Sequence, residues 1–369
     1  MDLALIGLPQ SGKTSLFQAL AAGRRGPLVG KQEHIAVVKL SDERLDRLAD
    51  LFQSKKITYA EIRLHDLPVA FQGGVALSSD LAPSLAGADA LVHVVRAFHR
   101  DDVPHSQGTV EPHRDIAALD AELLFHDLAI VERRLERLVA GVRSLRPADR
   151  EAGERELTLL RHVKDCLEQD IPLRARVFTP DEGKQLANYG LLSLKPLLLA
   201  INIDENDCPN APAIESDYRA RYAAASNGGG SASGRNTGVV AVCAKLEAEL
   251  AELPEEEADQ FRQELGATDS AVQRLFRLAQ QVLGLVTFYT VVGDECRAWP
   301  LPAGTTALRA AAKIHSDMER GFIRAEAIAW DKLLELGSLA EAKKHGLLRS
   351  EGKGYAVQDG DVLHILFHV

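Results

Sequence analysis

Several features that mark whole classes of protein are rare or absent in this sequence. Its 369 residues include four cysteines, and none of them belongs to a C-x-x-C pair. This pattern argues against a disulfide framework. We therefore expect reduced, mostly buried thiols in a cytoplasmic protein. The four residues are Cys166, Cys208, Cys243 and Cys296.

Long apolar runs and excess positive charge are also missing. No apolar stretch approaches the roughly 20 residues of a membrane span, and Met1 leads directly into a short apolar run, so we expect no signal peptide and no membrane partner. The net charge is -10, which argues against general nucleic-acid binding and makes DNA an unexpected partner. Hydrophobic residues make up 46% of the chain, and its length predicts two or three domains.

The strongest motif occupies the first twenty residues. The apolar run 3–6 predicts a buried strand, GLPQSGKT at 7–14 fits G-x-x-x-x-G-K-[ST], and a helical pattern follows. This is the context of a phosphate-binding loop, whose backbone N–H groups and helix N-terminus face phosphate. Lys13 would act on the β- and γ-phosphates as the catalytic residue, and Thr14 would bind Mg²⁺. The weaker alternative is a glycine-rich turn that binds nothing. The predicted loop contacts are Gly7, Gln10, Ser11, Gly12, Lys13, Thr14 and Ser15.

Further strands of the α/β pattern end on polar residues. Residues 57–64 alternate apolar and polar side chains, which predicts a strand, and Asp66 follows it. An aspartate at this point of a P-loop protein can hold Mg²⁺, although an ordinary turn aspartate is an equally good interpretation. The apolar run 195–201 predicts a buried strand that delivers Asn202 to Glu205 at its carboxyl end, where open α/β sheets bind ligands. The run 239–243 predicts another strand.

Two more regions have their own patterns. From residue 116 onward leucines and valines repeat four and three apart, and a second stripe at 157–167 follows a break at 146–149. This predicts an antiparallel helical hairpin. Its arginines and glutamates nearly balance, which favours a solvated face over an RNA-contacting one. From residue 285 two strands around Gly293-Asp294, a helix near 305–315 and strands at 322–328 and 362–367 predict a small β-grasp fold.

Several stretches resemble the YchF/Obg-like ATPases, a branch of the translation-factor-related P-loop NTPases. The most specific are EADQFRQELG, CRAWPLPAGTTALRAAAKIHSDMERGFIRAEAIAW and EGKGYAVQDGDVLHILFHV, and the family is matched also by DALVHVVRAF, VEPHRDIAALDAELLFHDLAIVERR and KPLLLAINIDEND. The resemblance implies an α/β fold: a Ras-like nucleotide-binding domain (1–115 and 185–284), an inserted helical hairpin (116–184) and a C-terminal TGS domain of β-grasp type (285–369). It also implies ATP hydrolysis with Mg²⁺ and association with ribosomes or their RNA, and we expect a monomer.

The resemblance also assigns the residues that would contact the base. Residues 202–205, NIDE, fit the family's NxxE box and not the guanine-specific NKxD, and residues 243–245, CAK, stand at the last base-contacting box. ATP is therefore the expected nucleotide, with GTP as the alternative. The implied base contacts are Asn202, Ile203, Glu205, Cys243, Ala244 and Lys245.

The sequence departs from the family pattern in both switch regions. Where the family has DxAG, this chain has Asp66-Leu67-Pro68-Val69, so that valine replaces the glycine whose N–H would face the γ-phosphate. Residues 28–38 contain no threonine to complete a Mg²⁺ shell. We therefore expect slow hydrolysis. The alternative is a pseudo-NTPase, an adaptor that binds nucleotide or RNA with little turnover.

Overall fold

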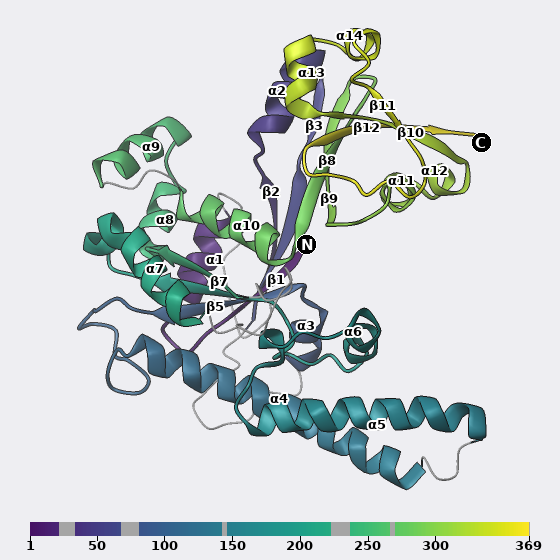
Figure 1. Ribbon diagram of the computed structural model, residues 1–369. Helices are drawn as coiled ribbons and strands as arrows, with labels where there is room; N and C mark the ends of the chain where they lie inside the picture. Colours follow the sequence, from purple (N-terminus) through teal and green to yellow (C-terminus); the bar gives the residue numbers. More distant parts are fainter. Residues whose placement is uncertain (22–33, 68–80, 142–145, 223–236, 266–269, 369) are drawn as a thin grey trace. The chain divides into compact units, whose positions relative to one another are not determined.

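The computed structural model describes residues 1–21, 34–67, 81–141, 146–222, 237–265 and 270–368. Contacts between residues divide the chain into two compact units (Figure 1). Unit 1 comprises Met1–Val38 and Arg63–Val282, and unit 2 comprises Lys39–Ile62 and Leu283–Val369. Each unit is built on its own six-stranded sheet.

The sheet of unit 1 has the strand order β2-β4-β1-β5-β6-β7. β1 pairs in parallel with β4 and β5, β5 pairs in parallel with β6, and β6 with β7. Because β4, β1, β5, β6 and β7 run parallel, their carboxyl ends meet at one edge, where the loop after β1 also lies. The strands are β1 (Asp2–Ile6), β2 (His34–Leu40), β4 (Ala60–Asp66), β5 (Ala90–Arg96), β6 (Leu197–Asn202) and β7 (Thr237–Val242).

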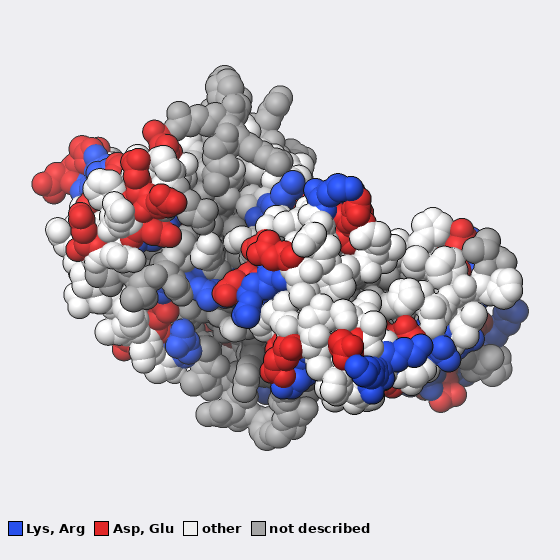
Figure 2. All heavy atoms as spheres, turned by 90° about the horizontal axis from the view of Figure 1, so that it is seen from above, with Lys and Arg blue, Asp and Glu red and all other residues white. Residues whose placement is uncertain are grey.

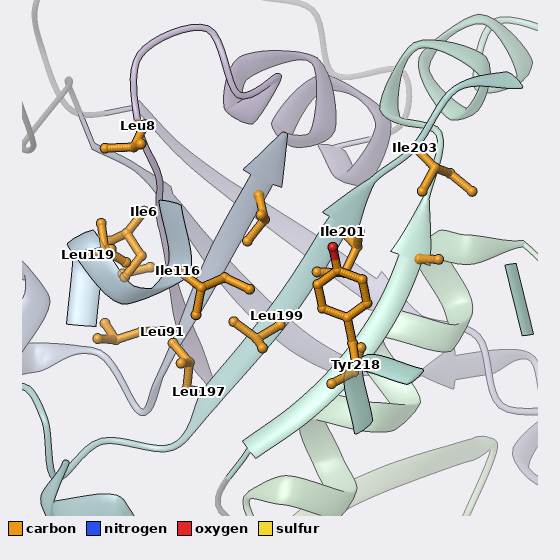
Figure 3. Close-up of a cluster of buried hydrophobic side chains, with 14 of the residues drawn as sticks. Ile6, Leu8, Leu91, Ile116, Leu119, Leu197, Leu199, Ile201, Ile203 and Tyr218 are labelled. Atoms are coloured by element: carbon orange, nitrogen blue, oxygen red, sulfur yellow. The ribbon is translucent and has the colours of Figure 1, made fainter. Parts of the chain in front are cut away.

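Apolar residues of the central strands form the core of unit 1. β5 and β6 are buried along their whole length, as expected for parallel strands covered on both faces. Ile6, Leu91, Leu199 and Ile201 pack with Ile116 of the first long helix in one cluster (Figure 3). The shorter helical segments of unit 1 are α1 (Lys13–Ala21), α3 (Ala82–Gly87), η2 (Leu173–Ala175), α6 (Pro180–Ala187), η3 (Glu205–Asn210), α7 (Ala211–Tyr222), α8 (Ala244–Leu250), α9 (Glu255–Glu264) and α10 (Ala271–Val282).

The predicted helical hairpin is present in unit 1. It consists of α4 (Pro112–Gly141) and α5 (Pro147–Glu168), which lie side by side in Figure 1. A buried seam joins them and includes Leu124, Val131, Leu138, Leu160, Val163 and Leu167. Ion pairs also cross between the helices, at 2.7 Å for Arg134 with Glu156 and 2.7 Å for Lys164 with Glu132. These pairs fit the interpretation of the charged residues as a solvated face.

Unit 2 confirms the predicted β-grasp fold. Its sheet has the order β11-β10-β12-β8-β9-β3, so the last strand of the chain lies inside the sheet. The strands are β3 (Lys56–Thr58), β8 (Leu285–Val292), β9 (Glu295–Pro302), β10 (Phe322–Ala329), β11 (Arg349–Glu351) and β12 (Asp361–Phe367). The helices are α2 (Glu43–Phe52), α11 (Ala307–Ile314), α12 (Ser316–Arg320), α13 (Trp330–Leu336) and α14 (Leu339–Lys344).

One sequence-based strand is divided in the structure. Residues 57–64 were expected to form a single strand, but the ladder is interrupted at Tyr59, with β3 pairing with β9 of unit 2 and β4 with β1 of unit 1. Apolar residues stand at positions 57 and 59 before the break and at 60, 62 and 64 after it, so the alternation changes phase at Tyr59, although it does not name the new partner strand.

The first sixty residues are therefore shared between the two units. The predicted nucleotide-binding domain included all of 1–115, whereas Lys39–Ile62 belongs to unit 2. In that segment α2 buries Leu45 and Leu48 in a cluster with Tyr289 and Cys296, and the hydroxyl of Tyr289 donates to Asp42 at 2.6 Å. Apolar burial against β8 and β9 explains why this segment departs from the predicted boundary.

The surface carries charges of both signs, as expected for a chain with 43 Lys and Arg and 53 Asp and Glu residues. Lys and Arg side chains are interspersed with Asp and Glu over much of the face in Figure 2. Within the described ranges, no helix has the length and apolar character needed to cross a membrane.

Candidate functional site

The loop between β1 and α1 has the backbone conformation that its glycines allow. Gln10 and Gly12 have φ values of 62° and 89°, in the left-handed region. A Cβ atom on Gly12 would lie 2.1 Å from Nδ2 of Asn202, and one on Gly7 would lie 2.6 Å from the Val94 carbonyl oxygen. Both glycines are thus required by close approach of neighbouring elements. α1 begins directly afterwards, at Lys13.

Lys13, Thr14 and Asp66 come together at this loop. Parallel pairing of β1 with β4 sets Leu5 opposite Asp66, which places the carboxylate beside the start of α1. Nζ of Lys13 lies 2.9 Å from Oδ1 of Asp66 and also donates to the carbonyl oxygen of Leu67. Oγ1 of Thr14 lies 3.5 Å from Oδ2 of the same carboxylate. Lys13 and Asp66 are 9% and 4% exposed, so the ion pair is screened little by water.

The donor set at Thr14 and Asp66 suits Mg²⁺. Among the residues that the structure describes, no group of three His, Cys, Asp or Glu side chains could hold a metal on its own. Mg²⁺ commonly takes only one or two protein oxygens and completes its shell with phosphate oxygens and water. The adjacent Thr14 hydroxyl and Asp66 carboxylate offer such a pair. Both oxygens lie beside the loop, where a bound phosphate would have to lie, and the metal-binding role of Asp66 stays a prediction.

Asn202 connects the loop to the far side of the site. Its Nδ2 donates to the Ser11 carbonyl oxygen at 2.9 Å, and its Oδ1 accepts from the Ala244 N–H at 3.0 Å. The register of the sheet explains this position, because Arg96, Asn202 and Val242 are aligned on β5, β6 and β7. With an exposed fraction of 4%, Asn202 holds the P-loop and the start of α8 at a fixed separation.

Some of the other residues assigned to the base are buried, and others are exposed to solvent. Ile203 is 3% exposed and packs in the core (Figure 3), and its N–H donates to the Val242 carbonyl oxygen. Glu205 is exposed at the start of η3. Cys243 is buried immediately before α8, whereas Lys245 is exposed and lies 3.8 Å from Glu249 on the same helix. The structure thus brings Asn202 and Ala244 to the loop and leaves Glu205 and Lys245 at the surface.

The end of β5 and the segment after it add two residues, Arg96 and Phe98, that the sequence did not predict as part of the site. Cε1 of Phe98 would lie 3.7 Å from a Cβ on Gly12, so this ring is beside the loop. Arg96 is buried, its guanidinium lies 4.5 Å from the Phe98 ring centroid, and its Nη2 donates to the Val103 carbonyl oxygen at 2.7 Å. Burial lowers the pKa of Arg96. The available signal was the buried run 89–98, which ends at the same sheet edge as the other motifs.

The two switch regions lie largely outside the described residues. Residues 22–33 and 68–80 are outside the described part of the chain, so the structure does not describe Pro68, Val69, Ala70 or Gln72.

His93, another candidate near the site, is described. It is 1% exposed on β5, opposite Ile6 and Leu199, and neither ring nitrogen has a hydrogen-bond partner among the described residues. Burial lowers its pKa to about 3.

Comparisons with known proteins match this architecture. A family model described as YchF-GTPase_C, protein of unknown function (DUF933), matches residues 285–368. A protein named ribosome-binding ATPase YchF from Bacillus subtilis (strain 168) is 36% identical over 376 residues, covering 100% of both chains. Its namesake from Haemophilus ducreyi is 36% identical over 372 residues, covering 99% of this chain and 98% of its own.

A solved structure is similar along nearly the whole chain. The YchF GTPase of Schizosaccharomyces pombe superposes with a TM-score of 0.83 at 25% sequence identity, covering 99% of this chain and 97% of that one. The relatives therefore match both units, including the loop between β1 and α1 and the C-terminal β-grasp fold. The resemblance noted in the sequence is confirmed, and the chain belongs to the YchF family.

Proposed function

We propose that this chain is a P-loop NTPase that binds ATP in preference to GTP, hydrolyses it slowly to ADP and phosphate, and acts as a switch on the ribosome. The observation that carries the proposal is the cluster of Lys13, Thr14 and Asp66 at the glycine loop. Relatives that match the full length are named ribosome-binding ATPases, which supports both the reaction and the partner.

Each group at the glycine loop would bind a different part of the nucleotide and its Mg²⁺. Backbone N–H groups between Gly7 and Lys13, together with the N-terminus of α1, would surround the phosphates. Nζ of Lys13 would exchange Asp66 and the Leu67 carbonyl for phosphate oxygens, since ammonium binds them as a point charge. Thr14 and Asp66 would hold Mg²⁺, which offsets negative charge on the β- and γ-phosphates when it is bound. Asn202 keeps Ser11 in place while Lys13 changes partners.

The proposed preference for adenine rests on the absence of a guanine-specific aspartate from the base-contacting segment. A guanine-specific box uses an aspartate that accepts from two N–H groups of the base, and a bidentate contact of this kind is worth about 1–3 kcal/mol. Glu205 is one methylene longer than that aspartate and lies exposed at the start of η3. Ile203 stands where the guanine-specific box has lysine, and its side chain is in the core. The base-contacting box therefore lacks the bidentate aspartate contact that would favour GTP over ATP.

The proposal also includes the partner, which is the ribosome or its RNA, and the cellular location. The hairpin α4–α5 and the β-grasp unit would contact the ribosome or its RNA, with the chain acting as a monomer in the cytoplasm and without a DNA or membrane partner. The alternative of an adaptor with little hydrolysis draws on the replaced switch residues, Val69 above all.

Calorimetry with ATP, GTP and Mg²⁺ tests the binding part. We expect ATP to bind at least as tightly as GTP and to bind more weakly when Mg²⁺ is chelated. GTP bound tenfold more tightly than ATP would overturn the adenine preference, and absence of binding to either would overturn the nucleotide site. Co-sedimentation with ribosomes, with and without nucleotide, tests the partner, and phosphate release measured beside it separates the NTPase from the adaptor.

A further inference from the structure

The segment that follows β5 is held by the segment at the end of β6. The N–H of Ala97 donates to the carbonyl oxygen of Asn202 at 2.8 Å, and the N–H of His99 donates to Oδ2 of Asp204 at 3.0 Å. Asp204 stands at the N-cap of η3, where an aspartate commonly accepts from the N–H groups of its own helix. Within the described chain its side chain makes no such capping bond, so the carboxylate serves the neighbouring segment instead.

Arg96, the last residue of β5, holds the same segment through its guanidinium group. Its Nε, Nη1 and Nη2 donate to the carbonyl oxygens of Phe98, Pro104 and Val103 at 3.3, 3.4 and 2.7 Å. The side chain is 2% exposed, and the planar fork of N–H groups in a guanidinium can reach several acceptors at once. One buried side chain therefore fastens both ends of the segment 98–104.

These contacts place the ring of Phe98 beside the P-loop. The Arg96 guanidinium is 4.5 Å from the ring centroid, a distance typical of a cation–π contact. A Cβ atom on Gly12 would lie 3.7 Å from Cε1 of Phe98 and 2.1 Å from Nδ2 of Asn202. The ring and this amide thus approach the same point of the P-loop, and Asn202 is the first residue of the base-contacting box. Phe98 is therefore on the side of the loop where the nucleoside would lie.

We infer that Arg96 and Asp204 are positioning residues for nucleotide binding: they hold the segment 97–104 so that the Phe98 ring borders the nucleoside half of bound ATP. The inference rests on the nucleotide-binding function proposed above. Both side chains are bonded to backbone groups of this segment, so they act through Phe98 and not by contact with the nucleotide. Within the box at 202–205, Asp204 is the residue to which no base contact was assigned.

Inorganic tripolyphosphate separates a positioning role from a purely structural one. It presents the phosphates of ATP without base or ribose, so it would contact the P-loop, Lys13 and Mg²⁺ but not the Phe98 ring. If Asp204 acts through the ring, its loss weakens ATP binding and leaves tripolyphosphate binding as it was. If Asp204 only supports the fold, both ligands lose affinity together, because the loop that they share is disturbed.

The experiment compares variants of the full-length protein. Asp204→Ala removes the acceptor, whereas Asp204→Asn keeps a side-chain oxygen that can accept from the His99 N–H. Asp207→Ala replaces the same type of residue within η3 and is the matched control. Calorimetry with Mg²⁺-ATP and with Mg²⁺-tripolyphosphate gives the two dissociation constants of each protein, and thermal unfolding measures its stability.

We expect ATP binding to weaken by about tenfold in Asp204→Ala, within the usual range of coupling between sites, with tripolyphosphate binding unchanged. Because the Asp204 side chain is 35% exposed, its truncation leaves no buried gap, and the unfolding temperature should change little. Asp204→Asn should recover most of the ATP affinity, and Asp207→Ala should behave like the parent protein. Arg96→Lys keeps the charge but loses the fork that reaches several carbonyl oxygens, so it should also weaken ATP binding selectively.

The outcomes separate this inference from the proposed function. Unchanged ATP affinity in Asp204→Ala overturns the role of Asp204, and unchanged affinity in Arg96→Lys overturns that of Arg96. Equal losses for ATP and tripolyphosphate show a structural role and overturn the positioning one. If Arg96→Lys does not fold, the Asp204 variants still decide between these results. The proposed function fails separately, when the parent protein binds neither ATP nor tripolyphosphate, and the inference then fails with it.

Discussion

Asn202 donates from its side-chain nitrogen to the carbonyl oxygen of Ser11 at 2.9 Å, across 191 positions of the sequence. The same side chain accepts from the N–H of Ala244 at 3.0 Å. Two segments that both belong to the candidate nucleotide site are thus joined by one buried amide. A substitution at this position tests how far the shape of the loop depends on that link.

Replacement of Asn202 by alanine should damage both stability and binding. The change leaves the Ser11 carbonyl and the Ala244 N–H without their partner in a buried position, and each unsatisfied group costs about 1–3 kcal/mol. We expect ATP affinity to fall at least tenfold, measured by calorimetry, and the free energy of unfolding to fall by about 2–6 kcal/mol. Asn206→Ala, at an exposed position of η3, is the matched control. Unchanged affinity in Asn202→Ala would show that the loop keeps its shape without the link.

Lys13→Ala should abolish tight nucleotide binding and also destabilise unit 1. Alanine removes the cation that would bind the phosphates, and it leaves the Asp66 carboxylate buried without its ion pair. Breaking one side of a buried pair costs about 3–5 kcal/mol. The double variant Lys13→Ala/Asp66→Asn removes the buried charge, so it should regain most of the stability without regaining binding. Thermal unfolding and calorimetry on the three proteins check this.

Two results would contradict that interpretation. ATP affinity unchanged in Lys13→Ala would mean that the loop is not the phosphate site. Stability that stays low in the double variant would mean that the loss came from the removed lysine stem rather than from the unpaired carboxylate.

The sequence predicted those parts of the molecule whose signals are local. The glycine loop, the buried strand β6, the heptad seam of α4 and α5, and the β8–β9 hairpin all follow from residue types at fixed spacing, and the structure contains each of them. The position of Asp66 beside the glycine loop needed one additional fact, the parallel pairing of β1 with β4. Position relative to a partner strand is what turns an ambiguous aspartate into a neighbour of Lys13.

What the sequence could not reveal depends on contacts between distant segments. Residues 57–64 were expected to form one strand, yet Tyr59 divides two strands that belong to different sheets. Ile203 fits the base-contacting box by spacing, but its side chain is used by the core. In each case tertiary packing, which has no local pattern, decided the outcome.

Unit 1 should lose stability as the pH falls below about 6.5 because of His93. Its pKa is lowered to about 3 by burial, whereas an unfolded histidine titrates near 6.5. As the pH falls, the unfolded state therefore binds the proton first. Between pH 6.5 and pH 3, this protonation of His93 lowers the free energy of unfolding by up to about 1.4 kcal/mol per pH unit. Above 6.5 the residue is neutral in both states and contributes no slope.

His93→Leu should remove that slope. Hydrogen exchange of residues 90–96, followed by mass spectrometry at pH 7 and pH 5, measures the local free energy of opening. We expect a smaller difference between the two pH values in the variant than in the parent protein. His99→Gln, at an exposed position, is the control and should behave like the parent. An identical pH dependence in His93→Leu would show that other groups dominate.

Removal of residues 361–369 should unfold unit 2 and abolish association with ribosomes. β12 lies between β10 and β8 in the sheet, so its loss leaves two unpaired edges and exposes the cluster around Leu363. Both tryptophans, Trp299 and Trp330, are in this unit, so their fluorescence should shift to longer wavelength. Co-sedimentation with ribosomes gives the second measurement.

His364→Ala is the control for this truncation, because His364 is exposed on the same strand. It should leave both the fluorescence and the ribosome association unchanged. Ribosome binding that survives the truncation would indicate that the hairpin or unit 1 provides the contact, and that the β-grasp unit has another role.

Hydrolysis by the purified protein should be slow. In Ras-type switches a glutamine after the second-switch glycine orients the attacking water, and in Gα proteins an arginine adds to this. Aligned on Asp66, that glutamine position is Ala70, which has no polar group, and Val69 replaces the glycine before it. Of the nearby histidines, His93 is buried within β5 and His65 lies 3.9 Å from Asp2. Neither is placed to orient a water molecule at the loop.

The charge that develops in the transition state would then rest mainly on Lys13, the loop N–H groups and Mg²⁺. We expect single-turnover hydrolysis of bound ATP below about 0.01 per second, the range of switch NTPases that act without a partner. The same assay with ribosomes present tests whether a partner supplies the missing group, and a faster rate there would support the switch over the adaptor. A rate of several per second for the protein alone would contradict the prediction, because Lys13 and the loop amides alone do not position a water, so a further catalytic group would have to exist.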